Sequence, residues 1–161
     1  YQQHRIFNWL FLVLMTHKAA DNNYHFRYFE KKIYQPKNKN HFDGQVYILT
    51  GGNTFSAATL VAEALKGQPH ITLVGEETGG GAYGNNAWLI PDVTLPITKV
   101  RFRLPLFRLV INKDEPKGWG VMPDIAVPPT AEAIRQNKDF KMEKVQQLIK
   151  EKSSVTSLQR K

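Results

Sequence analysis

The stretch VYILTGGNTFSAATLVAEALKG, residues 46–67, joins an apolar run to a helical pattern through two glycines and a polar turn. The run at 45–50 is rich in β-branched and aromatic residues, which predicts a buried strand. Residues 54–66 predict a helix, because Gly67 suits the position that follows a helix end. A second apolar run at 71–75 predicts another strand. A strand, a helix and a strand in succession form a βαβ unit, so the sequence predicts a parallel pair and an α/β fold.

The rest of the chain gives signals for further elements. Residues 5–20 have apolar side chains at helical spacing and predict a buried helix. Residues 21–43 are polar and aromatic, which fits a connector or a short helix followed by a loop. After a glycine-rich loop at 75–86, prolines separate strand-like segments, and a hairpin or a bent strand is expected near Pro105. The other expected elements are strands around 87–90, 93–103 and 106–112, a short extended piece at 124–127, a helix starting at Thr130 or Pro129, and a helix over about 138–152.

Composition bounds the classes of protein to which the chain can belong. The formal net charge is +8, from 22 Lys and Arg against 14 Asp and Glu, so nucleic-acid binding is one hypothesis. The basic residues are spread out without a dense block, which favours a solvated basic surface and no nucleic-acid partner. The absence of cysteine excludes disulfides, zinc–thiolate sites and a cysteine nucleophile. The longest apolar run, residues 9–15, is too short to span a bilayer, so no stable membrane insertion is expected.

Ser56 lies at the start of the helix predicted after the glycine turn. There the backbone N–H groups lack intrahelical partners and the helix dipole is positive, which suits a nucleophile whose attack builds negative charge on a carbonyl oxygen. The N–H of Ala57 is a candidate donor to that oxygen. Serine is also typical of helix starts, as are Asn53 and Thr54. Position alone favours a capping role for Ser56 and leaves the role of nucleophile open.

Three segments together resemble peptidase family S41, which includes the C-terminal processing (tail-specific) proteases and the tricorn-core-like proteases. FDGQVYILTGGNTFSAA at 42–58 is similar to the family's nucleophile segment, ITLVGEETGGG at 71–81 follows at the expected distance, and GVMPDIAV at 120–127 resembles the closing element. The resemblance implies an α/β fold related to the ClpP/crotonase spiral core of ββα repeats. It also implies that Ser56 is the nucleophile of a serine endopeptidase, which forms an acyl-enzyme with a peptide or protein substrate.

The general base distinguishes two branches of that family. The tail-specific proteases use a lysine, whose position here falls on about Gly81, and no lysine occurs between Lys66 and Lys99. The sequence is more similar to the tricorn-like branch, which uses Ser, His and Glu. In that branch the acidic residue shortly precedes the closing element, which implies Glu115 in preference to Asp114.

The glycines of the second matched segment are candidate substrate-binding residues. Gly79, Gly80 and Gly81 permit close approach of a substrate backbone, although a flexible surface loop fits the same pattern. The sequence has no cluster of His, Asp and Glu at ligand spacing and no phosphate-binding G-K-[ST] motif. Neither a metal nor an organic cofactor is therefore expected.

The family's base has no match among the histidines of this chain, which are His4, His17, His25, His41 and His70. In the tricorn-like branch that histidine lies far upstream of the serine. We therefore expect residues 1–161 to be the C-terminal part of one catalytic domain, with a matched core at about 42–128 and helices at about 130–152, and to be inactive alone.

Other functions stay open at this point. One is a non-catalytic S41-like domain that binds a peptide or another ligand, a second is a crotonase-like acyl-CoA enzyme, and a third is nucleic-acid binding. The resemblance suggests the cell envelope, the periplasm or the extracellular space, and the sequence does not indicate an oligomeric state.

Overall fold

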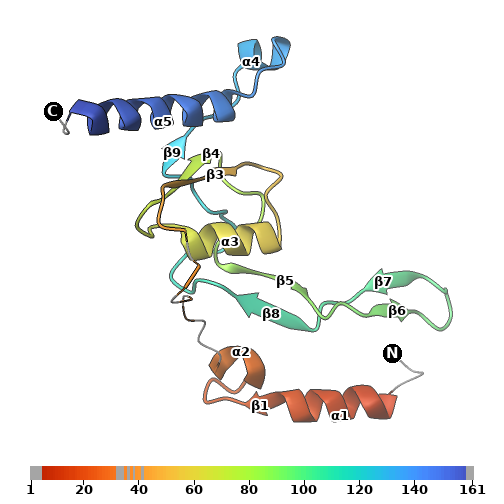
Figure 1. The fold of residues 1–161 in the computed structure, drawn as a ribbon. Coiled ribbons are helices and arrows are strands. Elements are labelled where there is room, and N and C mark those ends of the chain that lie inside the picture. The colour runs from red at the N-terminus through yellow and green to blue at the C-terminus, as the bar shows by residue number, and fades with distance from the viewer. Residues whose placement is uncertain (1–4, 32–34, 36, 38, 41, 159–161) are drawn as a thin grey trace. The chain divides into compact units, whose positions relative to one another are not determined.

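The computed structural model describes residues 5–31, 35, 37, 39–40 and 42–158, and the chain separates into two compact units (Figure 1). The sheet unit consists of Asp43–Leu89 and Pro105–Lys161. The hairpin unit consists of Tyr1–Phe42 and Ile90–Leu104.

A parallel sheet forms the centre of the sheet unit, with strand order β3-β4-β9. Strands β3 (Val46–Thr50) and β4 (Ile71–Gly75) pair in parallel, and helix α3 (Ala57–Leu65) connects them. Strand β9 (Ile125–Ala126) adds to the other edge of β4, also in parallel. The predicted βαβ unit and the α/β fold class are thus confirmed.

Small and branched side chains fill the core of the sheet unit. The buried cluster consists of Ala62, Leu73, Ala82 and Val121, and the partly buried Ile48 and Ile71 pack against it. Alanine on α3 lets the helix lie close to the sheet, and Leu73 and Val74 of β4 are fully buried because β4 is the central strand.

Helix α3 begins at Ala57, three residues after the predicted start, because residues 51–56 form a turn. In this turn the N–H of Thr54 donates to the Gly51 carbonyl at 2.8 Å, and the N–H of Gly51 donates to the Thr54 hydroxyl at 3.1 Å. The end of the helix is as predicted, since Gly67 has a φ of 74° and follows the last turn.

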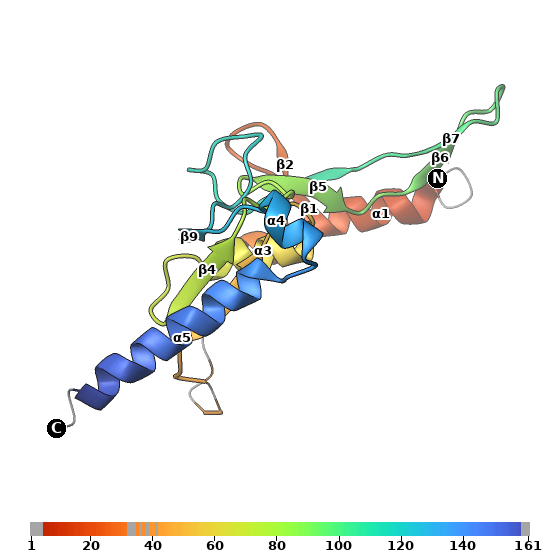
Figure 2. The same cartoon turned by 90° about the horizontal axis from the view of Figure 1, so that it is seen from above.

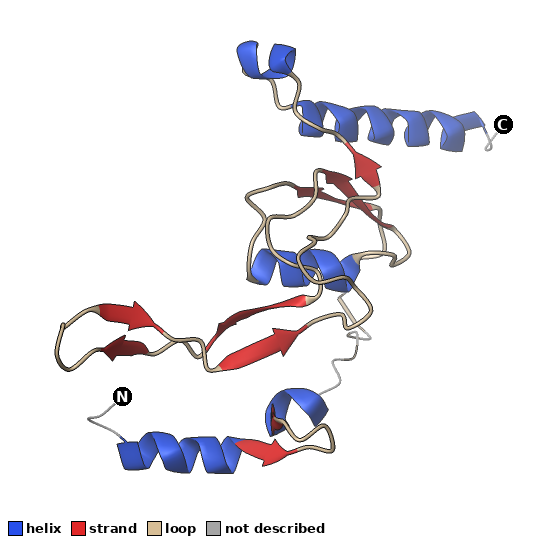
Figure 3. Cartoon of the chain, turned by 180° about the vertical axis from the view of Figure 1, so that it is seen from behind, coloured by secondary structure: helices blue, strands red, loops and turns tan. Residues whose placement is uncertain are grey.

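The other elements of the sheet unit follow α3 and β4 along the chain. Strands β5 (Gly84–Trp88) and β8 (Phe107–Val110) form an antiparallel ladder, one of the two-stranded pairs drawn in red in Figure 3. Helix α4 (Ala131–Arg135) starts as predicted, with the Thr130 hydroxyl accepting from the Ala133 N–H at 3.1 Å. Helix α5 (Phe140–Leu158) continues six residues past the predicted end at 152 (158 − 152) and contacts β3 and β4. Figure 2 shows it beside β4.

The hairpin unit contains the largest departures from the predictions. Helix α1 (Arg5–Met15) ends before residue 20, because β1 (Thr16–Lys18) and β2 (Tyr24–Phe26) form an antiparallel hairpin, which the sequence reading missed. The turn between the strands contains Asn22 at a φ of 67°, a conformation that asparagine tolerates. Helix α2 (Arg27–Lys31) is the short helix that was one of the two options for this region.

The prediction that the first helix is buried is wrong. Its apolar side chains are largely exposed, including Ile6 at 81% and Trp9 at 62%. Helical periodicity indicates an apolar face, but burial also requires an opposing element, which the pattern of one segment cannot supply. Among the described residues, no helix combines the length and apolar character needed to cross a membrane.

The strands on either side of Pro105 do not form a hairpin with each other. Strand β7 (Arg101–Arg103) instead pairs with β6 (Asp92–Thr94), while β8 pairs with β5. The turn of the β6–β7 hairpin lies at 95–100, where the N–H of Leu95 donates to the Val100 carbonyl at 3.0 Å. Residues 93–103 are therefore two strands and a turn, and Pro105 lies on the connection from β7 to β8.

Candidate active site

Ser56 occupies an unusual backbone conformation between the glycine turn and α3. Its φ of 52° and ψ of −122° lie in a region that residues with a side chain rarely adopt. Such a conformation costs about 1–3 kcal/mol and persists where the surrounding structure enforces it. A sharp and strained turn from a strand into a helix is also how the nucleophile elbow of α/β-hydrolases presents its serine.

The side chain of Ser56 does not cap the helix. The residue is exposed, and its hydroxyl makes no capping hydrogen bond to the first turn of α3. Ser56 thus occupies the N-cap position, but its hydroxyl does not make the hydrogen bond that the capping alternative requires. The serine is available for other chemistry.

The N–H of Ala57 is a free donor beside this serine. The N–H of Ala58 donates to the Phe55 carbonyl at 3.1 Å and that of Leu60 to the Ser56 carbonyl at 3.1 Å, whereas the Ala57 N–H has no acceptor in the described part of the chain. It lies at the positive end of the helix dipole. A donor in this position can stabilise an oxyanion that forms at the serine.

The glycine-rich loop packs closely against the serine turn. The N–H of Gly80 donates to the Thr54 carbonyl at 3.0 Å. A Cβ added to Gly79 would lie 2.1 Å from the Gly52 carbonyl oxygen, and one added to Gly80 would lie 2.2 Å from the Thr59 hydroxyl oxygen. These glycines are required for close contact, so the alternative of an unconstrained surface loop does not fit.

Two side chains of the loop connect it to the closing motif. Gly81 and Gly120 form an isolated antiparallel bridge, and the carboxylate of Glu77 accepts from the Gly120 N–H at 2.6 Å. The hydroxyl of the buried Thr78 accepts from the Val121 N–H at 2.8 Å. The second and third segments that carry the resemblance are therefore adjacent in space.

Asp124, in the same motif, fixes the centre of the sheet. Its carboxylate accepts from the N–H of Leu73 at 2.8 Å, and its own N–H donates to the Leu73 carbonyl at 2.9 Å. This pair of hydrogen bonds joins the motif to β4 just before β9 begins.

Glu115 lies in the loop between β8 and β9 and is half-buried. Its N–H donates to the Asn112 carbonyl at 3.4 Å. Within the described residues, no hydrogen bond or ion pair connects its carboxylate to Ser56, so the structure does not join these two predicted catalytic residues directly. Asp114, the other acidic option, is exposed.

Lys141 is a residue near the site that the sequence reading missed. Its ammonium lies 2.5 Å from a carboxylate oxygen of Glu76 and donates to the Thr50 carbonyl at 3.0 Å, at the carboxyl end of β3. A Cβ on Gly51 would lie 2.5 Å from the same ammonium. The sequence gives no local signal that relates a residue of α5 to a strand 91 positions earlier.

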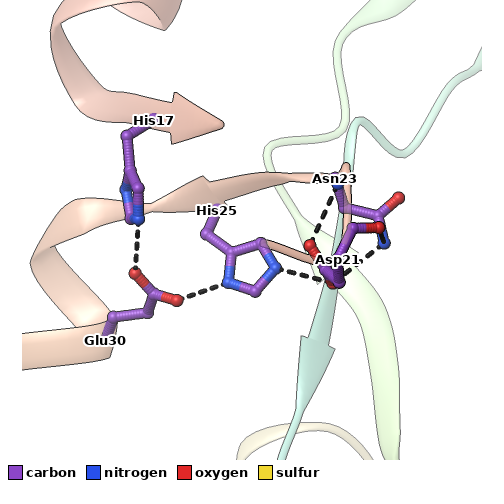
Figure 4. Close-up of polar contacts among 5 residues, drawn as sticks. All are labelled: His17, Asp21, Asn23, His25 and Glu30. Atoms are coloured by element: carbon purple, nitrogen blue, oxygen red, sulfur yellow. Dashed lines mark hydrogen bonds and ion pairs between the residues drawn. The ribbon is translucent and has the colours of Figure 1, made fainter. Parts of the chain in front are cut away.

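The hairpin unit contains a cluster of histidines and carboxylates, the imidazole cluster, made of His17, Asp21, His25 and Glu30 (Figure 4). Glu30 bridges the two imidazoles, with one oxygen 3.1 Å from His17 Nε2 and the other bonded to His25 Nδ1. The second nitrogen of His25 lies 3.0 Å from Asp21.

Hydrogen bonds determine the protonation of this cluster. Bonds from the side chain and backbone of Asn23, and then from His25, lower the pKa of Asp21 from 3.8 to about 2. Bonds to Asp21 and then to Glu30 raise the pKa of His25 above its ordinary value of 6.5. In the described part of the chain no group of three or more His, Cys, Asp or Glu side chains is arranged to hold a metal ion.

The strand β3 leads through a strained turn with an exposed serine into a helix whose first N–H is free. Hydrolases with a nucleophile elbow have a similar succession of elements. The model of peptidase family S41 matches residues 9–127. The chain therefore belongs to peptidase family S41, which confirms the resemblance carried by the three sequence segments.

A solved structure of another protein has a fold similar to that of this chain. The crystal structure of a protein from Parabacteroides merdae ATCC 43184, described as a candidate peptidase, is similar to this chain with a TM-score of 0.52 and 29% identity. The match covers 70% of this chain and 34% of that one, so this chain spans about a third of its length. No curated protein matches this sequence.

Proposed function

We propose that this chain is the serine-bearing part of a serine endopeptidase that hydrolyses peptide bonds through an acyl-enzyme on Ser56. The observation that carries the proposal is the strained conformation of Ser56 with an unengaged hydroxyl, next to the free N–H of Ala57. A serine that caps a helix typically has extended backbone angles, whereas the serine of a nucleophile elbow lies in a sharp, strained turn.

In the proposed reaction the Ser56 oxygen attacks the carbonyl carbon of a peptide bond and loses its proton to a general base. The Ala57 N–H donates to the oxygen that becomes negative. The C–N bond then breaks, the base returns the proton to the leaving amine, and water hydrolyses the acyl-enzyme by the same steps. Glu115 is proposed to orient the base, and Gly79, Gly80 and Gly81 to lie beside the substrate backbone.

The general base is proposed to be a histidine from a segment that precedes this chain, as in the tricorn-like branch. Accordingly, residues 1–161 are proposed to be the C-terminal part of one catalytic domain with a ClpP/crotonase-like core, inactive when isolated. A peptide or protein substrate and a location in the cell envelope, the periplasm or outside the cell belong to the same proposal. A domain that only binds peptides is the alternative.

Labelling with a fluorophosphonate, which reacts with activated serines, tests the proposal. The full-length protein is compared with its Ser56→Ala variant and with Ser153→Ala, which removes an exposed serine of α5 that bonds its own helix at 2.9 Å. We expect labelling in the full-length protein and in Ser153→Ala, and none in Ser56→Ala. Equal labelling of all three proteins, or no labelling of any, would contradict the assignment of Ser56 and favour the binding domain.

A further inference from the structure

Side-chain and backbone atoms of one residue, Asn112, organise the loop that carries Glu115. The Asn112 side-chain oxygen accepts from the Asp114 N–H at 3.1 Å, and its backbone oxygen accepts from the Glu115 N–H at 3.4 Å. Its own N–H donates to the Tyr83 carbonyl at 3.4 Å, at the end of the glycine-rich loop. Asn112 therefore shapes the turn that leads into Glu115.

The same side chain connects this loop to the serine helix. The amide nitrogen of Asn112 donates to a carboxylate oxygen of Glu63 on α3 at 2.7 Å. Glu63 lies within α3, the helix that begins directly after Ser56. The bond joins segments 49 residues apart in the chain.

Glu63 places a carboxylate group at a partly buried position of α3. Its second carboxylate oxygen is buried and has no hydrogen-bond partner among the described residues. A buried acceptor without a donor carries a free-energy cost, and an apolar residue would remove that cost. The Glu63 side chain therefore contributes at this position through its hydrogen bond to Asn112 more than through packing.

We propose that Asn112 and Glu63 are positioning residues that hold the Glu115 loop against the serine helix. The inference rests on the proposed function, because it assigns to Glu115 the orientation of the base. Each residue acts through the loop and does not contact the reacting atoms. Displacing a catalytic group by about 1 Å lowers a rate by as much as a hundredfold, so a single hydrogen bond at this point has a measurable effect.

Exchanging the donor and the acceptor tests the proposal. Asn112→Asp leaves an oxygen for the Asp114 N–H but sets a carboxylate against Glu63, so the rate constant for labelling of Ser56 is expected to fall about tenfold or more. Glu63→Gln retains an oxygen acceptor for the Asn112 amide, so a smaller loss than in Asn112→Asp is expected. The double variant restores an N–H donor facing an oxygen and is expected to recover most of the rate. Glu132→Gln, at an exposed position of α4 outside the site, is the control with unchanged labelling.

Two further measurements separate positioning from stability. Thermal unfolding of each variant reports stability, and the pH dependence of labelling reports the environment of the base. A positioning role predicts that Asn112→Asp shifts the pH profile and that the double variant restores it. Hydrogen exchange at Asp114 and Glu115 is expected to rise in Asn112→Asp and to return in the double variant.

The possible outcomes distinguish this inference from the function on which it rests. If the unmodified protein labels and Asn112→Asp labels equally fast with the same pH profile, the inference is wrong and the peptidase proposal stands. If the rate loss follows the loss of thermal stability and the double variant does not restore it, the pair is only structural. If the unmodified protein does not label, the proposed function fails first, and the positioning role fails with it.

Discussion

The serine turn and the imidazole cluster are both built from polar residues, but different forces hold them. At the serine turn, glycines bring backbone segments into contact, and most hydrogen bonds involve backbone atoms. In the imidazole cluster, ionisable side chains bond to one another, and a third or more of the surface of each side chain is exposed. We therefore expect the serine turn to be sensitive to added atoms, and the imidazole cluster to pH and salt.

The difference bears on the role proposed for Ser56, because a nucleophile requires fixed geometry. Close packing of Gly79 and Gly80 against the turn leaves Ser56 few alternatives to its strained conformation. The imidazole cluster has no comparable steric constraint, and its contacts weaken when a proton is lost or gained. Substitutions in and beside the serine turn should therefore act through packing, and changes in the imidazole cluster through protonation.

The largest effect is expected for Gly80→Ala. The added methyl group would lie 2.2 Å from the hydroxyl oxygen of Thr59, which is 1% exposed and donates to the Thr54 carbonyl at 2.9 Å. Since neither neighbour has room to move, overpacking is expected to lower the free energy of unfolding by about 3 kcal/mol. Denaturant unfolding measures the change.

Gly52→Ala is the matched control in the same turn. No atom lies within 4 Å of the position of its Cβ, so a change below about 0.5 kcal/mol is expected. If the two variants are equally stable, the close packing ascribed to the glycine-rich loop is wrong. The imidazole cluster should be unaffected by either variant.

An intermediate effect is expected for Lys141→Met. The substitution removes the ion pair with Glu76 and the hydrogen bond to the Thr50 carbonyl, which connect α5 to the end of β3. Because both side chains are partly exposed, the expected loss is about 1 kcal/mol, less than for a fully buried pair. The exposed Lys150 of the same helix provides the control, since Lys150→Met should change stability little. Equal losses in the two variants would show that the ion pair does not secure α5.

Whether a feature could be predicted from the sequence depends on how far apart in the chain the interacting residues lie. Strands β3 and β4, helix α3 and the glycine after it were predicted, since apolar runs and terminal residues act within a few positions. The contacts of Lys141 and Asn112 join residues 91 and 49 positions apart, and no local pattern encodes them.

Two further features were missed for other reasons. Strands β1 and β2 have three residues each, too few for an alternating pattern to be recognised. The conformation of Ser56 is enforced by its neighbours, so serine alone suggested only a helix start. The resemblance to family S41 implies that Ser56 is the nucleophile, a role that we propose for it.

The smallest effect is expected from pH, in the imidazole cluster. The pKa of His25 is raised above 6.5, so its contribution to stability is fully present below about 6.5 and is lost as pH rises through the folded pKa. The pKa of Asp21 is lowered to about 2, so its contribution is present above 3.8 and is lost as pH falls toward 2. The β1–β2 hairpin should therefore be most stable between about pH 4 and 6.5.

Hydrogen exchange against pH, corrected for intrinsic exchange rates, tests this window. We expect protection of β1 and β2 to decrease above pH 6.5 and to be weakened by salt, because the cluster is exposed. His25→Gln should remove the dependence above pH 6.5, and β3 and β4 should show little change over the same range. Equal pH dependence in the hairpin and in the parallel sheet would mean that a global transition governs both. The contrast between an electrostatic cluster and a sterically fixed turn would then be wrong.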